Sequence, residues 1–258
     1  MRARSLCVMT ESGSVIFCRA PDEPHVPAST LKLLTAFVAR QWVKDRDLSN
    51  VVRVEAADLA KGSTMKLRDG DVVTWNDLFH GLIIPSGNDA ARVIARIIGT
   101  RRQEEMRTGN SEDAFLDLMR AATRGLGWED FVIASPSGLE GRSRLSARQI
   151  CSLALKVDPY VRAVASRRQY CVRVAGANER TYDIKHSLSL QEWALLPALS
   201  WVKTGTRKSA SIANLVAVWR GQDGVRNAAC LLGLWPTYER GPELRRIIDF
   251  LGSLDASG

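Results

Sequence analysis

Apolar and polar residues alternate along both ends of the chain, in the pattern that half-buried strands produce. Near the N-terminus two such runs flank a Glu-Ser-Gly-Ser turn, so residues 5–19 are predicted to form a hairpin. Further strands are predicted at residues 201–205, 212–220 and 225–235. Between the two ends, apolar residues recur every three or four positions, which predicts helices. Helices are expected near residues 29–42, 74–85, 89–98, 111–125 and 146–157, and a last one at 242–251 after the strands.

Strands at both ends and helices between them predict an α+β fold. We expect one antiparallel sheet formed by N- and C-terminal strands, with flanking helices and an inserted helical lobe of about residues 60–160. Residues 100–110 are polar and are expected to be a surface insertion. Residues 1–258 are ample for a single domain, whose cleft should lie between the sheet and the lobe.

Composition narrows the possible functions only a little. Apolar residues make up 45% of the chain and charged residues 25%, which are ordinary values for a globular protein. The net charge of +8 is compatible with nucleic acid, an anionic membrane or an anionic polymer such as a cell wall. The basic residues are scattered and are not interleaved with aromatic residues, so we expect a solvated basic surface and no nucleic-acid partner.

No apolar run approaches the length needed to span a bilayer, so no transmembrane segment is expected. The first residues lead directly into strand-like sequence and lack the apolar core of a signal peptide. From these features the protein is expected either to be cytoplasmic or to lack its export segment in this sequence.

The five cysteines are widely spaced and the chain has only three histidines, so neither a metal site nor a cofactor is expected. If Ser12-Gly13 forms a two-residue hairpin turn, Glu11 faces Ser14 and Cys7 faces Cys18. Facing residues on antiparallel strands come within disulfide range. A disulfide and two reduced cysteines used as small apolar residues are both compatible with this pairing.

Candidate chemistry begins with Ser29 and Lys32, three residues apart at the start of a helix-forming run. This spacing is nearly one helical turn, so the two side chains share a face within hydrogen-bonding reach. A serine hydroxyl becomes a nucleophile when a base accepts its proton, and a lysine can be that base when its pKa is lowered. Taken alone, so short a motif is more often an N-cap serine followed by a solvated lysine.

Ser86 and Asn88 lie two residues apart on a predicted tight turn. Both side chains can point into a cleft, where the hydroxyl passes a proton and the amide holds Lys32 or a substrate amide. Without the other pieces this is an ordinary turn sequence.

Lys203, Thr204 and Gly205 lie on a predicted strand, where alternation places Lys203 and Gly205 on one face. Lys203 supplies positive charge that keeps Lys32 deprotonated and attracts a substrate carboxylate, to which Thr204 can donate. Gly205 is expected to leave room for a ligand along the strand edge. Alone, this piece is equally a solvated lysine before a turn glycine.

In this order, the three pieces resemble the three motifs of the penicillin-recognising serine acyl-transferases. Further stretches narrow the resemblance to the low-molecular-weight penicillin-binding proteins, the serine-type D-alanyl-D-alanine carboxypeptidases of peptidase family S11. The similarity extends from residue 5 to about residue 252, over the family's whole catalytic domain. The stretches that carry it are residues 27–32, 62–67, 81–91 and 135–139, the last of which resembles the family's Asn-Pro-x-Gly-Leu.

The resemblance implies a β-lactamase/transpeptidase-like fold and a serine acyl-enzyme. Ser29 would attack the terminal D-Ala-D-Ala bond of a peptidoglycan stem peptide, with Lys32 as the base and Ser86 protonating the leaving D-alanine. The backbone N–H groups of Ser29 and Thr206 would hold the oxyanion. β-Lactams would be covalent inhibitors, and the expected location is extracytoplasmic, in the periplasm or cell wall. The implied substrate-binding residues are Asn88, Lys203, Thr204, Gly205, Thr206 and Arg240.

Two positions depart from the family pattern. Arg207 stands where members commonly have a threonine, and Ser211-Ile212 stands where they often have Ala-Gly. Both lie beside the expected substrate edge, so the resemblance leaves the substrate open. Many members also carry a C-terminal β-domain and a membrane-binding helix, whereas this chain stops at Gly258, which predicts a soluble or loosely attached protein.

Three related functions are alternatives. A class A β-lactamase typically has Asp inside the second motif and a Glu-x-x-Leu-Asn segment, whereas this chain has Gly87 and no such segment. A penicillin-binding sensor would be acylated without turnover, and its transmembrane tether is not present in this sequence. A D,D-endopeptidase acting on peptidoglycan cross-links uses the same motifs and stays open, because the difference lies in the shape of the cleft.

Overall fold

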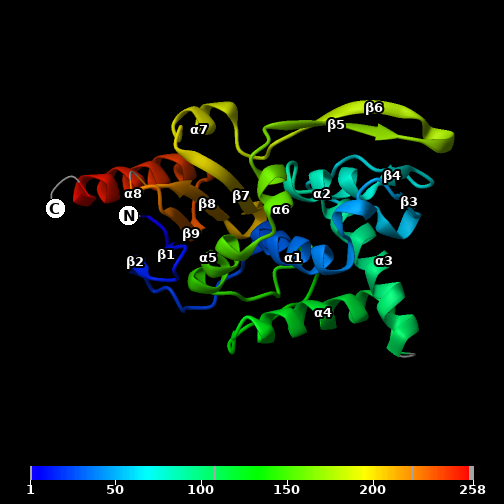
Figure 1. Ribbon diagram of the computed structural model, residues 1–258, viewed down its shortest axis with the longest axis horizontal. Coiled ribbons are helices and arrows are strands. Elements are labelled where there is room, and N and C mark those ends of the chain that lie inside the picture. Colours follow the sequence, from blue (N-terminus) through cyan, green and yellow to red (C-terminus); the bar gives the residue numbers. More distant parts are fainter. Residues whose placement is uncertain (1, 107–108, 222, 256–258) are drawn as a thin grey trace.

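Strands from both ends of the chain form one antiparallel sheet in the computed structural model, which describes residues 2–106, 109–221 and 223–255 (Figure 1). The strand order is β2-β1-β9-β8-β7, so the N-terminal hairpin lies beside the last strand of the chain. This arrangement confirms the predicted α+β fold with a sheet assembled from both termini. The strands are β1 (Ser5–Thr10), β2 (Val15–Arg19), β7 (Leu199–Arg207), β8 (Ile212–Arg220) and β9 (Arg226–Leu234).

Helices α1 to α7 lie between β2 and β7 in the chain, and α8 follows β9. Helices α3 and α4 lie side by side (Figure 1). A Cβ atom on Gly99 of α3 would stand 1.8 Å from the carbonyl oxygen of Ser111, so only glycine permits this approach. The helices are α1 (Lys32–Trp42), α2 (Trp75–Ile83), α3 (Asn88–Met106), α4 (Ser111–Gly125), α5 (Ala147–Lys156), α6 (Pro159–Ala165), α7 (Leu190–Ala194) and α8 (Arg240–Asp255).

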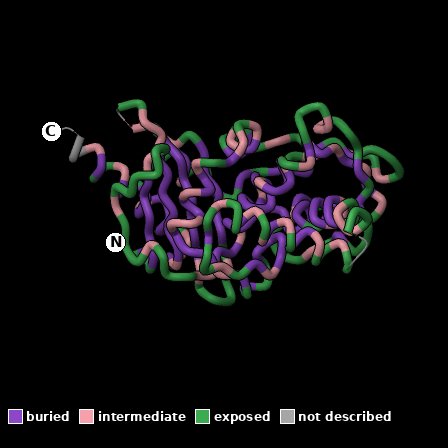
Figure 2. The backbone as a smooth tube through the Cα atoms, turned by 60° about the horizontal axis from the view of Figure 1, so that its bottom comes forward, coloured by how far each residue is buried: buried purple, intermediate pink, exposed green. Residues whose placement is uncertain are grey.

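Both faces of the five-stranded sheet are covered, because alternation along its strands feeds two separate cores. On one face, Leu215 and Ala217 of β8 join a core with apolar residues of α8. On the other face, Val216 and Val218 join the larger core, to which α1 and α5 contribute. Figure 2 shows buried segments both in the sheet and in the helices beside it.

Two short hairpins lie outside this sheet. One pairs β3 (Val51–Arg53) with β4 (Val72–Thr74), and the other pairs β5 (Gln169–Val174) with β6 (Arg180–Lys185). The β5–β6 hairpin extends along the side of the molecule that carries α2 (Figure 1). The pattern analysis predicted no element at residues 169–185.

The polar segment at residues 100–110 is not a surface insertion throughout. Helix α3 continues to Met106, because Arg, Gln and Glu are good helix formers and Arg102 forms an ion pair with Glu105 one turn later at 3.0 Å. Residues 107–108 of the predicted insertion lie outside the described residues.

The predicted two-residue turn of the first hairpin is also wrong. Thr10 N donates to Ser14 O at 2.9 Å, so three residues form the turn, and the register shifts between Val8 and Met9. The register shift offsets the longer turn, so Cys7 still pairs with Cys18 as expected. Both are free thiols, Cys7 buried and Cys18 exposed.

Candidate active site

Ser29 lies in a 3-10 turn, Ala28–Leu31, that leads directly into α1. A local hydrogen bond stabilises the turn, since Thr30 Oγ1 donates to Pro27 O at 2.7 Å. Ala28 has a φ of +47°, which is unusual for a residue with a side chain and is typical of strained functional segments. This strained residue lies directly before Ser29.

Lys32 is the first residue of α1 and lies one turn beyond Ser29. Its Nζ donates to Ser29 Oγ at 2.9 Å, to Asn88 Oδ1 at 2.8 Å and to Ser137 O at 2.9 Å. The side chain is fully buried. This burial lowers the pKa of Lys32 to about 7, while the charge of Asp89 opposes the shift.

Ser86 and Asn88 flank a tight turn between α2 and α3. Ser86 adopts a φ of +65°, a second strained residue with a side chain. Asn88 is buried, and its Nδ2 donates to Lys61 O at 2.8 Å while its Oδ1 accepts from Lys32. The turn is therefore attached to both the Ser29 helix and the segment around residue 61.

Strand β7 carries the third predicted motif, Lys203, Thr204 and Gly205. Lys203 is fully buried, and its Nζ donates to Ser86 Oγ at 2.8 Å and to Thr204 O at 3.0 Å. Burial lowers the pKa of Lys203 well below its ordinary value, and the positive charges of Lys32 and Arg240 lower it further. Each of the two lysines is thus hydrogen-bonded to one serine hydroxyl. Burial lowers the pKa of both lysines.

Gly205 does not leave room for a ligand as the sequence suggested. A Cβ atom there would stand 2.8 Å from Pro27 O and 3.0 Å from Thr30 N. The missing side chain instead lets the turn that carries Ser29 lie against β7.

Thr204, Thr206 and Arg240 lie at the same end of β7. Thr204 Oγ1 is hydrogen-bonded to Ser187 Oγ. Arg240 Nη1 donates to Thr206 Oγ1 at 3.1 Å, and its Nε donates to Thr237 O at 3.1 Å. Arg240 is buried and therefore belongs to the same group of site residues, although it lies farthest along the sequence.

A cleft of about 730 Å³ opens above these groups. Ser29, Asn88, Thr206 and Arg240 line it, while both lysines and Ser86 are buried behind its wall. The full lining is Ser29, Gly62, Ser63, Asn88, Gly138, Leu139, Ser187, Thr206, Arg207, Lys208, Ser209, Thr237 and Arg240.

The profile of peptidase S11, described as D-alanyl-D-alanine carboxypeptidase, matches residues 1–233. The chain belongs to this S11 family. The chain is 33% identical to the D-alanyl-D-alanine carboxypeptidase DacB2 of Mycobacterium tuberculosis, over 51% of this chain and 40% of that protein. It is 21% identical to DacF of Bacillus subtilis, over 95% of this chain and 61% of DacF. It therefore spans less than two thirds of the length of either relative.

Solved structures show the same fold as this member of the S11 family. A DD-transpeptidase from Streptomyces superposes with a TM-score of 0.85 at 22% identity, covering 97% of both chains. A D-alanyl-D-alanine carboxypeptidase from M. tuberculosis superposes with a TM-score of 0.78 at 24% identity, covering 97% of this chain and 91% of the other. The fold is thus the β-lactamase/transpeptidase-like fold.

The candidate site includes two residues that were not predicted from the sequence. Asn214 of β8 is buried, and its Nδ2 donates at 2.9 Å to both Val26 O and Pro27 O, just before Ser29. Asp89 accepts from Met65 N at 2.9 Å and from Leu67 N at 3.2 Å, which ties the segment before α2 to the Asn88 turn. Both are polar residues among apolar neighbours, a signal of burial that does not reveal their partners.

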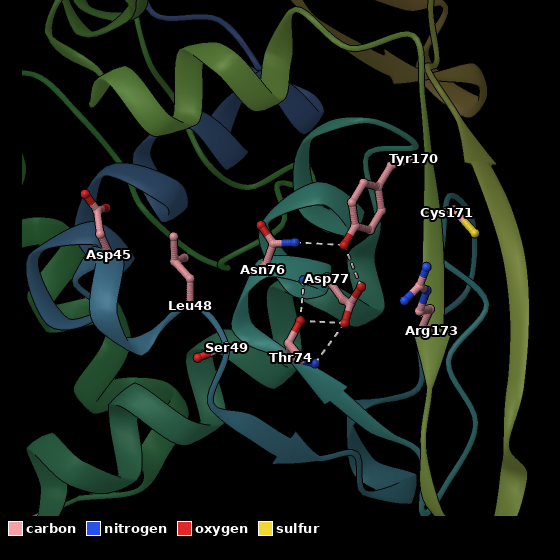
Figure 3. A pocket seen from close by; sticks show the side chains of 9 residues that line it. All are labelled: Asp45, Leu48, Ser49, Thr74, Asn76, Asp77, Tyr170, Cys171 and Arg173. Carbon is pink, nitrogen blue, oxygen red and sulfur yellow. Dashed lines mark hydrogen bonds between the residues drawn. The ribbon is translucent and has the colours of Figure 1, made fainter.

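A second pocket of about 580 Å³ lies beside the β5–β6 hairpin and is lined by different residues (Figure 3). Tyr170 Oη donates to Asp77 Oδ1 at 2.9 Å and accepts from Asn76 Nδ2 at 2.7 Å. Asp77 also accepts from Thr74 N at 2.9 Å, which caps α2. These polar groups form hydrogen bonds with one another and thereby attach the β5–β6 hairpin to the N-terminus of α2.

Among the described residues, no group of three or more His, Cys, Asp and Glu side chains is placed to hold a metal ion. Within that same part of the chain, none of the helices combines the length and the apolar character that crossing a bilayer requires.

Proposed function

We propose that the protein is a serine-type D-Ala-D-Ala carboxypeptidase that removes the terminal D-alanine from peptidoglycan stem peptides through an acyl-enzyme. The observation that carries the proposal is the pair of lysine–serine hydrogen bonds at one cleft, from Lys32 to Ser29 and from Lys203 to Ser86. Membership of the S11 family supports the same reaction.

Acylation begins at Ser29, whose hydroxyl lines the cleft. With a pKa of about 7, Lys32 is largely neutral at slightly alkaline pH and accepts the serine proton as Oγ attacks the scissile carbonyl. The backbone N–H groups of Ser29 and Thr206 hold the oxyanion that forms. The C–N bond then breaks and leaves an ester on Ser29.

The leaving D-alanine amine needs a proton as that bond breaks. Ser86 Oγ is the donor, and Lys203, which is hydrogen-bonded to it, stabilises the alkoxide character that develops. A water molecule then attacks the ester and gives up a proton to Ser86, which restores its hydroxyl, while Lys32 returns its proton to Ser29 Oγ as the ester C–O bond breaks. Asn88 positions Lys32 throughout, because its Oδ1 accepts from Nζ.

Recognition of the substrate depends on its terminal carboxylate. Thr206 and Arg240 line one end of the cleft, where hydroxyl and guanidinium donors suit a carboxylate. Thr204 is buried behind this end and is hydrogen-bonded to Ser187, which lines the cleft. Gly205 acts by letting Ser29 approach β7. β-Lactams carry a carboxylate and a strained amide, so they acylate Ser29 in the same way. The proposal includes residues 1–258 acting as one catalytic domain outside the cytoplasmic membrane, with the lobe of about residues 60–160 forming one cleft wall.

The test is the Ser29→Ala variant. We expect it to lose covalent labelling by a fluorescent penicillin and D-alanine release from a peptide that ends in D-Ala-D-Ala, with an unchanged circular dichroism spectrum. Labelling that survives in the variant would refute Ser29 as the nucleophile. A cross-linked peptide dimer in the same assay tests the endopeptidase alternative, which is favoured if the dimer is cleaved faster. Labelling of the wild type without D-alanine release would instead indicate a sensor.

A further inference from the structure

We propose that Arg207 and Lys208 form a second anion-binding subsite at the cleft, which selects stem peptides carrying a side-chain carboxylate on the residue before D-Ala-D-Ala. The inference rests on the proposed carboxypeptidase function and adds the class of substrate to it. Its starting point is Arg207, which ends β7 directly after Thr206 and lines the cleft together with Lys208.

The first observation is the charge of the cleft lining. Its residues include three cations, Arg207, Lys208 and Arg240, and no aspartate or glutamate. A substrate that ends in one carboxylate neutralises one of these charges, at Arg240. Two positive charges then remain, so a ligand with a second anionic group complements the cleft better.

The second observation is that these two side chains have no partner among the described residues. Arg240 is hydrogen-bonded to Thr206 and Thr237 and lies 3.9 Å from Glu192. By contrast, the side chains of Arg207 and Lys208 make no hydrogen bond or ion pair with any residue that the structure describes. An arginine with five free donors at a cleft is suited to bidentate binding of a carboxylate.

The third observation is where the Arg207 guanidinium lies. A Cβ atom on Gly141 would stand 1.3 Å from Arg207 Nη1, so the guanidinium rests directly on the backbone of that glycine. Because Arg207 is half-buried there, an ion pair at this point is less screened than one on the open surface.

The position of this guanidinium fixes which part of the substrate meets it. Thr206 directs its hydroxyl to Arg240, and the next residue of the strand points to the opposite side, toward Gly141. Gly138 of the same segment lines the cleft and packs against Ala28, next to Ser29. A peptide with its C-terminus at Arg240 and its scissile carbonyl at Ser29 therefore continues toward Arg207 with the residue on the acyl side.

Two matched peptides test the inference. Both are acetyl-L-lysyl-D-Ala-D-Ala, with the lysine side-chain amine acetylated in one and succinylated in the other, so they differ by one carboxylate. We expect the wild type to show a kcat/KM about threefold to tenfold higher for the succinylated peptide. The Arg207→Ala variant should lower this ratio severalfold, and the Arg207→Ala/Lys208→Ala variant should bring it close to one.

The matched control is Arg101→Ala, which removes one positive charge from an exposed site on α3 and should keep the wild-type ratio. A ratio near one in the wild type, or a ratio unchanged in the double variant, overturns the subsite while leaving the proposed function intact. If neither peptide releases D-alanine and penicillin does not label Ser29, the proposed function itself fails.

A measurement on the unmodified protein guards against variants that do not fold. Raising the ionic strength from about 0.02 M to about 0.5 M shortens the Debye length from about 20 Å to about 4 Å. If the preference for the succinylated peptide arises from Arg207 and Lys208, the ratio must fall with added salt. A ratio that is high but insensitive to salt overturns the electrostatic subsite.

Discussion

Lys32 combines two properties that rarely occur together, since its amine is fully buried yet makes three hydrogen bonds to neutral oxygens. Carbonyl, amide and hydroxyl oxygens satisfy the N–H donors without a carboxylate in direct contact that would hold the proton in place. Burial therefore acts on the pKa with little opposition except from Asp89. The amine stays attached to Ser29 while remaining able to accept its proton.

This environment predicts the pH dependence of acylation. The protonated form of Lys32 cannot act as a base, so the rate of penicillin labelling should rise with pH through about 7 and level off above it. Below about pH 6 the rate should fall roughly tenfold per pH unit. Stopped-flow acylation over this range measures the midpoint. The Lys32→Arg variant, which stays protonated, should lose labelling at every pH, and a flat wild-type profile would contradict Lys32 as the base.

Replacement of Asn214 tests whether the position of Ser29 depends on its contact with β8. Asn214→Ala leaves the carbonyls of Val26 and Pro27 without this donor, which should cost about 2 to 4 kcal/mol of unfolding free energy. Because the strained Ala28 follows directly, acylation should also slow by about tenfold or more. Urea unfolding and penicillin labelling measure the two effects.

The matched control for this prediction is Asn227→Ala. Asn227 is also buried in the sheet, but its side chain makes one long hydrogen bond, to Val225 O at 3.4 Å. A similar loss of acylation in both variants would show that the effect comes from the sheet in general and not from the segment before Ser29.

At the scale of elements, the sequence predicts what depends on local pattern. Hydrophobic periodicity predicts the strands at both ends and the helices around the motifs. The motif residues are predicted because a serine acyl-enzyme needs a hydroxyl beside an amine. The β5–β6 hairpin was missed because the consecutive apolar residues Tyr170, Cys171 and Val172 interrupt the alternation along β5, although in the structure only Val172 and Val174 of this strand are buried. The partners of Asn214 and Gly205 could not be predicted, because those contacts exist only once distant segments pack together.

The packing of α3 on α4 gives a prediction at this scale. In Gly99→Ala the new Cβ would overlap the Ser111 backbone, so the helices must separate at a cost of about 1 to 3 kcal/mol in unfolding free energy. Gly125→Ala, at the end of α4, meets nothing within 4 Å and should instead stabilise the protein by up to about 1 kcal/mol. Urea unfolding of both variants checks the opposite signs. Equal effects of the two substitutions would show that the helices do not pack as closely as described.

At the scale of the whole molecule, the sheet and the helices contribute separate parts of one site. The 3-10 turn and α1 supply Ser29 and Lys32, and the turn between α2 and α3 supplies Ser86, whereas the sheet supplies Lys203 and Thr206. The hydrogen bond from Lys203 to Ser86 crosses between these parts and is buried. Anything that loosens the packing of the helices on the sheet should therefore act on catalysis as well as on stability.

Buried histidines should make that packing sensitive to acid. Burial lowers the pKa values of His80, which stacks on Tyr170, and of His186, beside β7, to about 4 from the usual 6.5. Because these values are depressed in the folded state, their contribution to stability is complete above about pH 6.5 and is lost as the pH falls toward 4, by about 3 kcal/mol for each histidine. Urea unfolding at a series of pH values should show this decline. His80→Phe, which retains an aromatic ring beside Tyr170 but does not titrate, should reduce the decline by about half, and an unchanged decline in that variant would place the acid sensitivity elsewhere in the molecule.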